Sequence, residues 1–220
     1  MNKPIIIADL AYKGLKRSGR GTGRQGLKAT LKYLQFRDKR NNHLAQSRDY
    51  ERWQDHGLGV SYSEIYRNCD ALQSKHVLAW TWVISPAPDL MALVPQDERR
   101  ALLYELTEWV VEDYYTERGF DVPEFSYLMH TAKTKGKEGE PAQEHLHTHV
   151  ILPGTAPSTA DRIPVYNNTT KGHDRLFREI AAAHFADMLD ERSIDWRLLR
   201  EEPRVERDTD EIDLDNFFSR

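Results

Sequence analysis

The sequence predicts an α+β domain, built on a mostly antiparallel central sheet with helices packed against it. Short stretches rich in β-branched and aromatic residues alternate with longer stretches whose apolar residues recur at helical spacing. Two apolar stretches, residues 125–131 and 145–152, are separated only by a polar loop, so we expect them to be antiparallel neighbours. With 220 residues, 39% of them hydrophobic, the chain is long enough for one packed domain.

The N-terminal region predicts a strand, a loop and a helix. Residues 4–8 include three consecutive isoleucines and are expected to form the first strand. Residues 13–24 are basic and rich in glycine, which is typical of a loop. From Arg24 to about Phe36 the pattern is helical, because apolar residues fall at i, i+4 and i+7: Leu27, Leu31 and Leu34.

The next region predicts mostly irregular chain followed by a short helix. Residues 37–60 are polar and show no clear period. Residues 61–73 form a short helix in this interpretation, with Ser61 or Ser63 as its N-cap, since serine oxygens accept hydrogen bonds from the first free amides of a helix.

The second half predicts three more strands and two long helices. Residues 76–84, HVLAWTWVI, have the composition of a central strand. A long helix follows over residues 97–117 and is expected to stop at Gly119. After the strands at 125–131 and 145–152, an amphipathic helix covers residues 174–190. We therefore assign residues 1–195 to one domain and residues 196–220 to an acidic, mobile tail.

Charge is distributed unevenly along the chain, although the net charge is only −4. Residues 1–52 carry thirteen Lys or Arg against four Asp or Glu, a net charge of +9. Residues 201–220 carry three Arg against eight Asp or Glu, a net charge of −5. A basic segment of this kind is either a surface that binds phosphates or an ordinary solvated surface, and charge alone favours neither.

Composition also indicates the cellular compartment of the protein. No apolar run is long enough to cross a bilayer, and the N-terminus lacks the features of a signal peptide, so we expect no membrane association. Cys69 is the only cysteine, which excludes an internal disulfide and fits a reducing, cytoplasmic compartment. We interpret Cys69 as a small, buried side chain rather than a reactive thiol.

Four of the nine histidines lie between positions 130 and 149. Alternate residues of a strand point to one face, so His145, His147 and His149 share a face. His130 ends the preceding strand and reaches the same face if the two strands pair. Imidazoles that converge in this way are expected to bind a metal ion, and three ligands leave coordination positions open for catalysis. We choose His130, His147 and His149 as ligands and leave His145 at the rim, or as a group that supports a ligand from behind.

These motifs resemble those of the HUH endonucleases, which carry two histidines separated by one residue on a central strand. The run Leu146-His147-Thr148-His149 is similar to the third motif of conjugative and mobilisation relaxases, in which His130 has the place of the third ligand. Many relaxases have an aspartate shortly after that first histidine, whereas this chain has Thr131-Ala132. A carboxylate that orients a ligand would therefore come from elsewhere, and the candidates are Asp9, Asp38 and Glu144.

The segment from Arg24 to Asp38 resembles the first motif of the VirD2-like (MOBP-type) relaxases, in which a basic helix carries the nucleophilic tyrosine. The matching residue is Tyr33, followed by Leu34 and Arg37. Helix geometry supports this choice, because at about 100° per residue Tyr33 lies away from the leucine stripe. Arg37, one turn further on, is expected to hold a phosphate or favour the phenolate. The alternative is a tyrosine that only packs against its neighbours.

The resemblance implies a five-stranded sheet, as in the relaxase palm, and a site- and strand-specific DNA nicking-joining enzyme. Such an enzyme cleaves single-stranded DNA at an origin of transfer, by tyrosine transesterification and with a 5′-phosphotyrosine intermediate. The implied cofactor is a divalent metal ion, Mg²⁺ or Mn²⁺, and the implied setting is a bacterial cytoplasm with relaxosome accessory and coupling proteins. We expect DNA to be contacted by Lys16, Arg17, Arg20, Arg24, Lys28 and Lys32.

Three other functions share parts of this pattern. A replication initiator or transposase of the same superfamily usually has its tyrosine after the histidine motif, where this chain has only Tyr166. A metal-dependent hydrolase would use water in place of tyrosine. A non-catalytic module would bind metal and DNA without cleaving.

Overall fold

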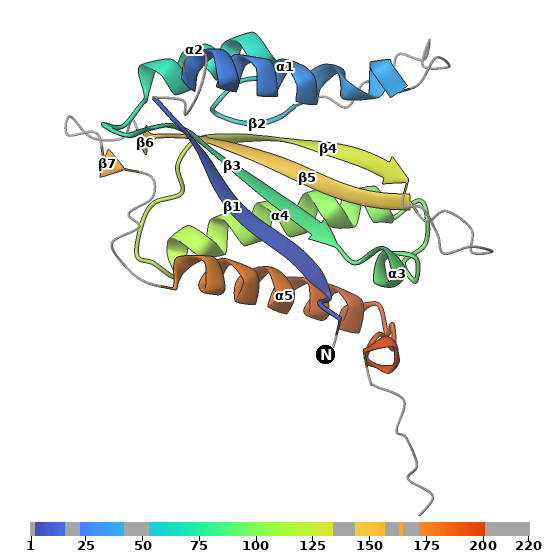
Figure 1. The fold of residues 1–220 in the computed structure, drawn as a ribbon. Helices are drawn as coiled ribbons and strands as arrows, with labels where there is room; N and C mark the ends of the chain where they lie inside the picture. The colour runs from blue at the N-terminus through green and yellow to red at the C-terminus, as the bar shows by residue number, and fades with distance from the viewer. Residues whose placement is uncertain are drawn as a thin grey trace, which may run out of the picture.

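A five-stranded antiparallel sheet forms the centre of the computed structural model (Figure 1), which describes residues 3–15, 23–41, 53–133, 144–156, 163–164 and 172–200. The strand order is β1-β3-β5-β4-β2, and every neighbouring pair is antiparallel. The strands are β1 (Ile6–Gly14), β2 (Gln54–His56), β3 (Val77–Pro86), β4 (Phe125–Lys133) and β5 (Glu144–Pro153). The predicted α+β class and five-stranded sheet are confirmed.

Helices cover both faces of this sheet. One face carries α4 (Arg99–Thr116) and α5 (His173–Glu191), and the other carries α1 (Gly23–Asn41) and α2 (Tyr62–Ala71) (Figure 1). The smaller elements are α3 (Pro88–Met91), the 3₁₀ helix η1 (Arg197–Leu199) and a separate pair of two-residue strands, β6 (Thr155–Ala156) and β7 (Ile163–Pro164). No helix among the described residues has both the length and the apolar character needed to span a membrane.

The larger hydrophobic core lies between the sheet and the α4–α5 layer. Its centre is aromatic: Trp82 of β3 stacks on Tyr115 and makes an edge contact with Tyr114 of α4, and it also contacts Phe177 of α5. All four side chains are almost completely buried. Large aromatic groups of this kind contribute much of the burial energy of a core, so this layer makes the sheet a rigid platform.

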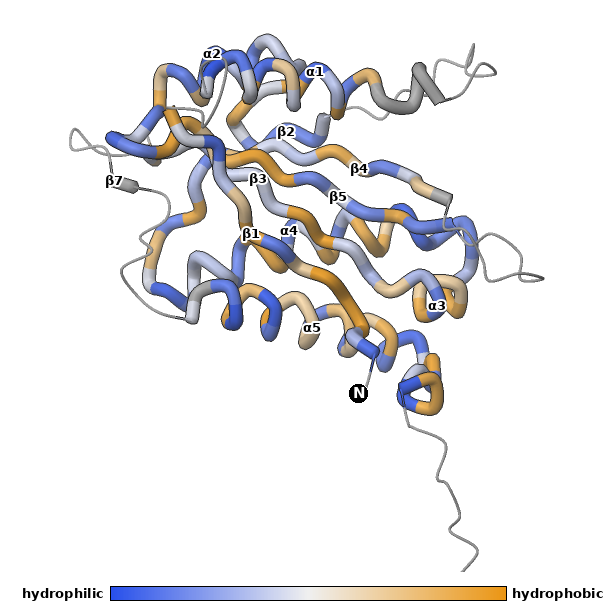
Figure 2. Tube along the Cα trace, viewed as in Figure 1, coloured by the Kyte–Doolittle hydropathy of each residue, from blue (hydrophilic) through white to orange (hydrophobic). Residues whose placement is uncertain are grey.

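A smaller core lies under α1 and α2. The leucine stripe of α1 (Leu27, Leu31 and Leu34) is buried there, with Ile65 and Cys69 of α2 and Leu128 and Ile151 of the sheet. Burial raises the pKa of the Cys69 thiol to about 12, so the thiol is protonated and unreactive at neutral pH. In the hydropathy colouring of Figure 2, β4 and β5 change from hydrophobic to hydrophilic toward the end that carries the histidines.

Two predicted boundaries differ from the structure. β1 continues to Gly14, whereas we predicted a strand over residues 4–8 and a loop from 13, because residues 9–13 pair one by one with the long strand β3 and this pairing outweighs their weak strand propensity. We interpreted residues 37–60 as irregular, but α1 reaches Asn41 and β2 forms an edge strand. A three-residue strand is too short to show an alternating pattern.

The predicted helix ends are confirmed where local chemistry defines them. Ser61 is the N-cap of α2 and accepts a hydrogen bond from the Glu64 amide at 3.3 Å. Glu64 in turn accepts from the Val60 amide at 3.0 Å. Gly119 has a φ of 71°, which glycine adopts without strain just past the end of α4.

Candidate metal and nucleophile site

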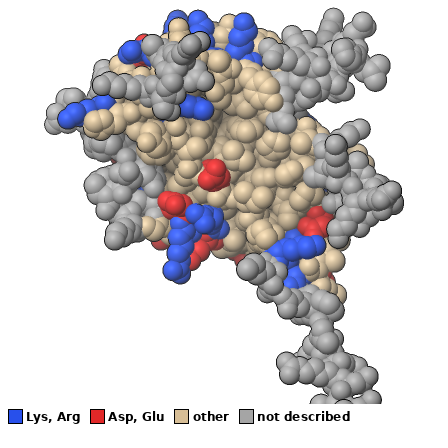
Figure 3. Space-filling view, in the orientation of Figure 1, with Lys and Arg blue, Asp and Glu red and all other residues tan. Residues whose placement is uncertain are grey.

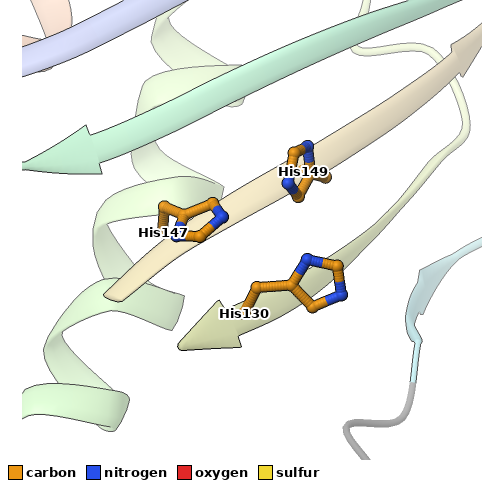
Figure 4. A group of neighbouring side chains, drawn as sticks. All are labelled: His130, His147 and His149. Atoms are coloured by element: carbon orange, nitrogen blue, oxygen red, sulfur yellow. The ribbon is translucent and has the colours of Figure 1, made fainter. Parts of the chain in front are cut away.

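Three histidines converge on the face of the sheet under α1 (Figure 4). His130 of β4 lies directly opposite His147 of β5 in the strand register, and His149 is two residues further along β5. One nitrogen from each ring forms a group in which all three atoms lie within 4.8 Å of one another. The ring centroids are 5.1 Å apart for His130–His149 and for His147–His149, and 5.8 Å for His130–His147. The hairpin therefore brings together the three side chains predicted as ligands.

Backbone carbonyls hold two of these rings from the outside. Nε2 of His130 donates a hydrogen bond to the carbonyl oxygen of Leu34 on α1, at 2.8 Å. Nδ1 of His147 lies 3.3 Å from the carbonyl oxygen of His145. Hydrogen bonds of this kind fix the orientation of an imidazole and determine which ring nitrogen carries its proton.

His145 lies beside this group but outside it. Its Nε2 is hydrogen-bonded to the Ser85 hydroxyl at 2.6 Å, and Ser85 is itself buried near the end of β3. Burial lowers the pKa of His145, so the neutral ring is favoured at pH 7. Ser85 directly follows the predicted strand at residues 76–84, and no local pattern in the sequence indicates its contact with a histidine 60 residues away.

The donor set fits a transition-metal ion. His130 is completely buried and His147 almost so, and clustered buried imidazoles gain little without a cation or hydrogen-bond partners. Neutral imidazole suits Zn²⁺, Cu²⁺, Fe²⁺ and Ni²⁺, whereas Mg²⁺ prefers oxygen ligands. The group contains no carboxylate among the described residues. Of the carboxylates named above, Glu144 faces Arg99 at 4.0 Å, Asp9 is two strands away from β5, and the Asp38 side chain is outside the described part.

Tyr33 lies on the α1 turn that rests on this site. Its side chain is 46% exposed, while Leu27, Leu31 and Leu34 are buried beneath the helix, as the helical pattern predicted. The bond from His130 reaches the carbonyl of Leu34, the next residue, so this turn of α1 is in direct contact with a candidate ligand. The exposed Tyr33 residue therefore lies next to the backbone carbonyl through which α1 contacts the buried His130.

Comparison with solved structures shows a similar architecture. A structure of the conjugative relaxase TrwC in complex with oriT DNA, in a copper-bound form, matches with a TM-score of 0.51 and 17% identity. The match covers 83% of this chain and 70% of that chain. The chain has the fold of a conjugative relaxase. A second TrwC structure with oriT DNA, metal-bound, has a TM-score of 0.49 and 12% identity over 84% of this chain and 70% of that one. No protein-family model and no curated protein matches the sequence.

In this relaxase fold, basic side chains gather over the layer of α1 and α2 (Figure 3). Lys32 is exposed on α1, and Lys28 lies 5.7 Å from the centre of the Tyr66 ring. Arg24 donates to the Asp70 carboxylate at 2.5 Å and to Gln73 at 3.1 Å, so its charge is already paired within the protein. Of the other predicted DNA contacts, Lys16, Arg17 and Arg20 lie outside the described residues, as does the side chain of Arg37.

Gln35 fixes the position of α1 and was not predicted from the sequence. The Gln35 side-chain oxygen accepts from the Tyr62 amide at 2.7 Å and from Nε1 of Trp53 at 3.3 Å. Trp53 directly precedes β2 and Tyr62 is the first residue of α2, so Gln35 fastens the Tyr33 turn of α1 to the starts of both elements. A single glutamine between Leu34 and Phe36 gives no signal of such a contact.

Two histidines elsewhere make ordinary contacts. His56 pairs with Glu108 at 3.2 Å and stacks on Phe125, and His184 pairs with Asp113 at 2.7 Å. Neither belongs to the metal-binding group found among the described residues.

Proposed function

We propose that this chain is a relaxase of the HUH superfamily that nicks and rejoins single-stranded DNA through Tyr33. The observation that supports this most strongly is the bond between His130 and the carbonyl of Leu34, because it joins the histidine group to the helix turn that carries an exposed tyrosine. The relaxase fold adds to this support. Assignment to the VirD2-like (MOBP-type) group rests on the Arg24–Asp38 motif.

The reaction we propose is a transesterification. The phenolate oxygen of Tyr33 attacks phosphorus, an O–P bond forms, and the bond to the 3′ oxygen breaks. The products are a 5′-phosphotyrosine and a 3′-hydroxyl that has taken up one proton, and the energy of the phosphodiester bond is retained for rejoining. A metal ion bound by the three histidines would neutralise charge on the scissile phosphate. Arg37, one turn beyond Tyr33, is proposed to bind a phosphate oxygen.

The substrate we propose is single-stranded DNA at an origin of transfer. The TrwC structure is a complex with oriT DNA, and here the exposed Lys32 and Lys28 lie on the same helix as Tyr33. With Lys16, Arg17 and Arg20 of the preceding basic segment, they would contact the DNA backbone. The setting we propose is a bacterial cytoplasm, with accessory and coupling proteins of a plasmid or another mobile element.

The three imidazole donors distinguish between the two metal ions expected from the sequence, Mg²⁺ and Mn²⁺. Imidazole nitrogens bind first-row transition metals better than they bind Mg²⁺, which requires oxygen ligands and releases water reluctantly. We therefore propose a first-row transition metal rather than Mg²⁺: Mn²⁺ is the sequence-based candidate that this leaves, and Zn²⁺, Cu²⁺, Fe²⁺ and Ni²⁺ suit imidazole better.

The test is covalent trapping on single-stranded oligonucleotides that contain an origin-of-transfer nick site, with Mn²⁺ present. Tyr33→Phe removes only the hydroxyl and should abolish both cleavage and the adduct while metal and DNA binding persist. Tyr12→Phe is the matched control, because Tyr12 is also exposed but packs on Trp80 at the far edge of the sheet.

Mass spectrometry of the adduct separates the alternatives. An adduct on Tyr166, which lies outside the described residues, would indicate a replication initiator or transposase. Cleavage that survives Tyr33→Phe without any adduct would indicate a hydrolase that uses water. Metal and DNA binding without cleavage on any origin sequence would indicate a binding module.

A further inference from the structure

The hydrogen bond between His130 and α1 fixes the tautomer of that ring. A backbone carbonyl oxygen only accepts hydrogen bonds, so Nε2 of His130, 2.8 Å from the Leu34 oxygen, must carry a hydrogen. A neutral imidazole has one N–H, and therefore its lone pair is on Nδ1. In Figure 4 the Nδ1 edge of the His130 ring faces His149, and the Nε2 edge points away from the group.

His147 has the opposite arrangement. Its Nδ1 lies 3.3 Å from the His145 carbonyl oxygen, which again can only accept, so the lone pair of His147 is on Nε2. The two rings thus present different nitrogens to the shared space, because one is held from the helix side and the other from its own strand.

We infer that His130 binds the metal ion through Nδ1 while its Nε2–H holds the Leu34 carbonyl, so that one ring links the metal to the helix that carries Tyr33. This inference rests on the metal site of the proposed function but not on the nicking reaction. At the same metal ion, His147 binds through Nε2, because its Nδ1 faces the His145 carbonyl.

A consequence is that metal binding and the docking of α1 strengthen each other. A coordinated imidazole is held in one orientation, and its remaining N–H becomes a stronger donor, so the bond to Leu34 is reinforced when metal is bound. By thermodynamic reciprocity, a docked α1 raises metal affinity by the same factor. Loss of an outer partner of this kind typically lowers metal affinity about 10- to 100-fold.

The ligand atom can be read directly by NMR. In protein labelled with ¹⁵N-histidine, long-range ¹H–¹⁵N spectra distinguish a metal-bound Nδ1 from a metal-bound Nε2. With Zn²⁺ as a diamagnetic probe, His130 should show a protonated Nε2 and a Zn²⁺-shifted Nδ1, and His147 should show a Zn²⁺-shifted Nε2. Coordination of His130 through Nε2 would overturn the inference and leave the metal site intact. No Zn²⁺ shift at any of the three histidines would overturn both.

Hydrogen exchange tests the link to α1 in the metal-free protein, so that it does not depend on activity. His130→Ala and His149→Ala each remove one candidate ligand, and His130→Ala also removes the hydrogen bond to the Leu34 carbonyl of α1. His130→Ala should speed amide exchange across residues 31–38 by about tenfold or more, whereas His149→Ala should leave it nearly unchanged. Equal effects of the two variants would refute the link.

A third variant keeps the experiment decisive if His130→Ala folds poorly. His130→Gln places an amide N–H near the position of Nε2 and so retains a donor for Leu34 while removing the imidazole ligand. Its α1 exchange should match that of the metal-free wild type and should no longer slow when Zn²⁺ is added. A Zn²⁺ response in His130→Gln equal to that of the wild type would show that the metal acts on α1 by another route.

Discussion

Gln35 offers a quantitative test of how α1 is held over the site. Its side-chain oxygen accepts two hydrogen bonds, from the Tyr62 amide at 2.7 Å and from Nε1 of Trp53 at 3.3 Å. The Tyr62 amide is one of the first amides of α2, which have no partner within their own helix, and Trp53 is buried. Gln35→Ala would leave both donors without this acceptor.

The expected cost follows from these two contacts. A typical hydrogen bond contributes about 1 kcal/mol net, and a buried donor left unsatisfied costs about 1–3 kcal/mol. Since Nε1 of Trp53 is the more distant donor and Tyr62 is only half-buried, we expect Gln35→Ala to lower the free energy of unfolding by about 2 kcal/mol. Gln35→Glu keeps an acceptor oxygen and adds a negative charge at the N-terminus of α2, so it should cost less than about 0.5 kcal/mol at pH 7.

Urea unfolding followed by circular dichroism measures these differences, and single-turnover nicking measures their effect on Tyr33. Because Gln35 is two residues beyond Tyr33 on the same helix, nicking should slow in Gln35→Ala and persist in Gln35→Glu, with metal affinity changed in the same order. The reasoning is refuted if Gln35→Ala is as stable as the wild type, or if Gln35→Glu is destabilised as much as Gln35→Ala.

Three further predictions concern the metal, the Arg200–Asp89 ion pair and the basic surface. His147→Ala should abolish Mn²⁺ binding in calorimetry while His145→Ala weakens it far less, and equal losses would mean that the chosen ligands are wrong. The Arg200 side chain holds the pKa of Asp89 below its ordinary value, so Asp89→Asn should cost about 1–2 kcal/mol at pH 7 after allowance for partial exposure. The ionised Asp89 carboxylate therefore stabilises the fold above about pH 4, and this contribution is lost as pH falls through the lowered pKa of Asp89. The melting temperatures of the wild type and Asp89→Asn should then converge in acid. Lys32→Gln should reduce the log–log salt slope of single-stranded DNA binding by about 0.7, and an unchanged slope would mean that Lys32 contacts no phosphate.

Much of the fold was predictable because its central elements have strong periodic patterns. The strand at 76–84 and the hairpin formed by 125–131 and 145–152 all appear within a few residues of their predicted bounds. The short strand β2 was not predictable, since three residues at the sheet edge carry no alternation. The described fold also continues through η1 to Arg200, whose contact with Asp89 spans 111 residues of sequence.

The candidate site, like the fold, was predictable from the sequence only in part. The three histidines could be placed together from sequence, because strand alternation and hairpin pairing are local rules that fix which side chains share a face. The position of α1 could not, since it depends on a backbone carbonyl at Leu34 and on the Gln35 oxygen, neither of which leaves a pattern. The pairing of Arg24 with Asp70, 46 residues away, was equally hidden. Sequence thus indicated which histidines lie together but not what holds the helix above them.

The two halves of the site differ in how firmly they are held. Behind His147 and His149, the intervening Thr148 points to the opposite face and is hydrogen-bonded to Thr107 of α4 at 2.8 Å, in a fully buried contact. The histidine strand is therefore fastened from behind to the aromatic core. The Tyr33 turn is held instead by the small leucine core and by the contacts of Leu34 and Gln35. A nicking-joining enzyme needs a fixed metal site for both directions of its reaction, while its tyrosine must approach and leave the phosphorus. For the proposed reaction, a rigid strand for the candidate ligands and a more lightly fastened helix for Tyr33 would meet both needs.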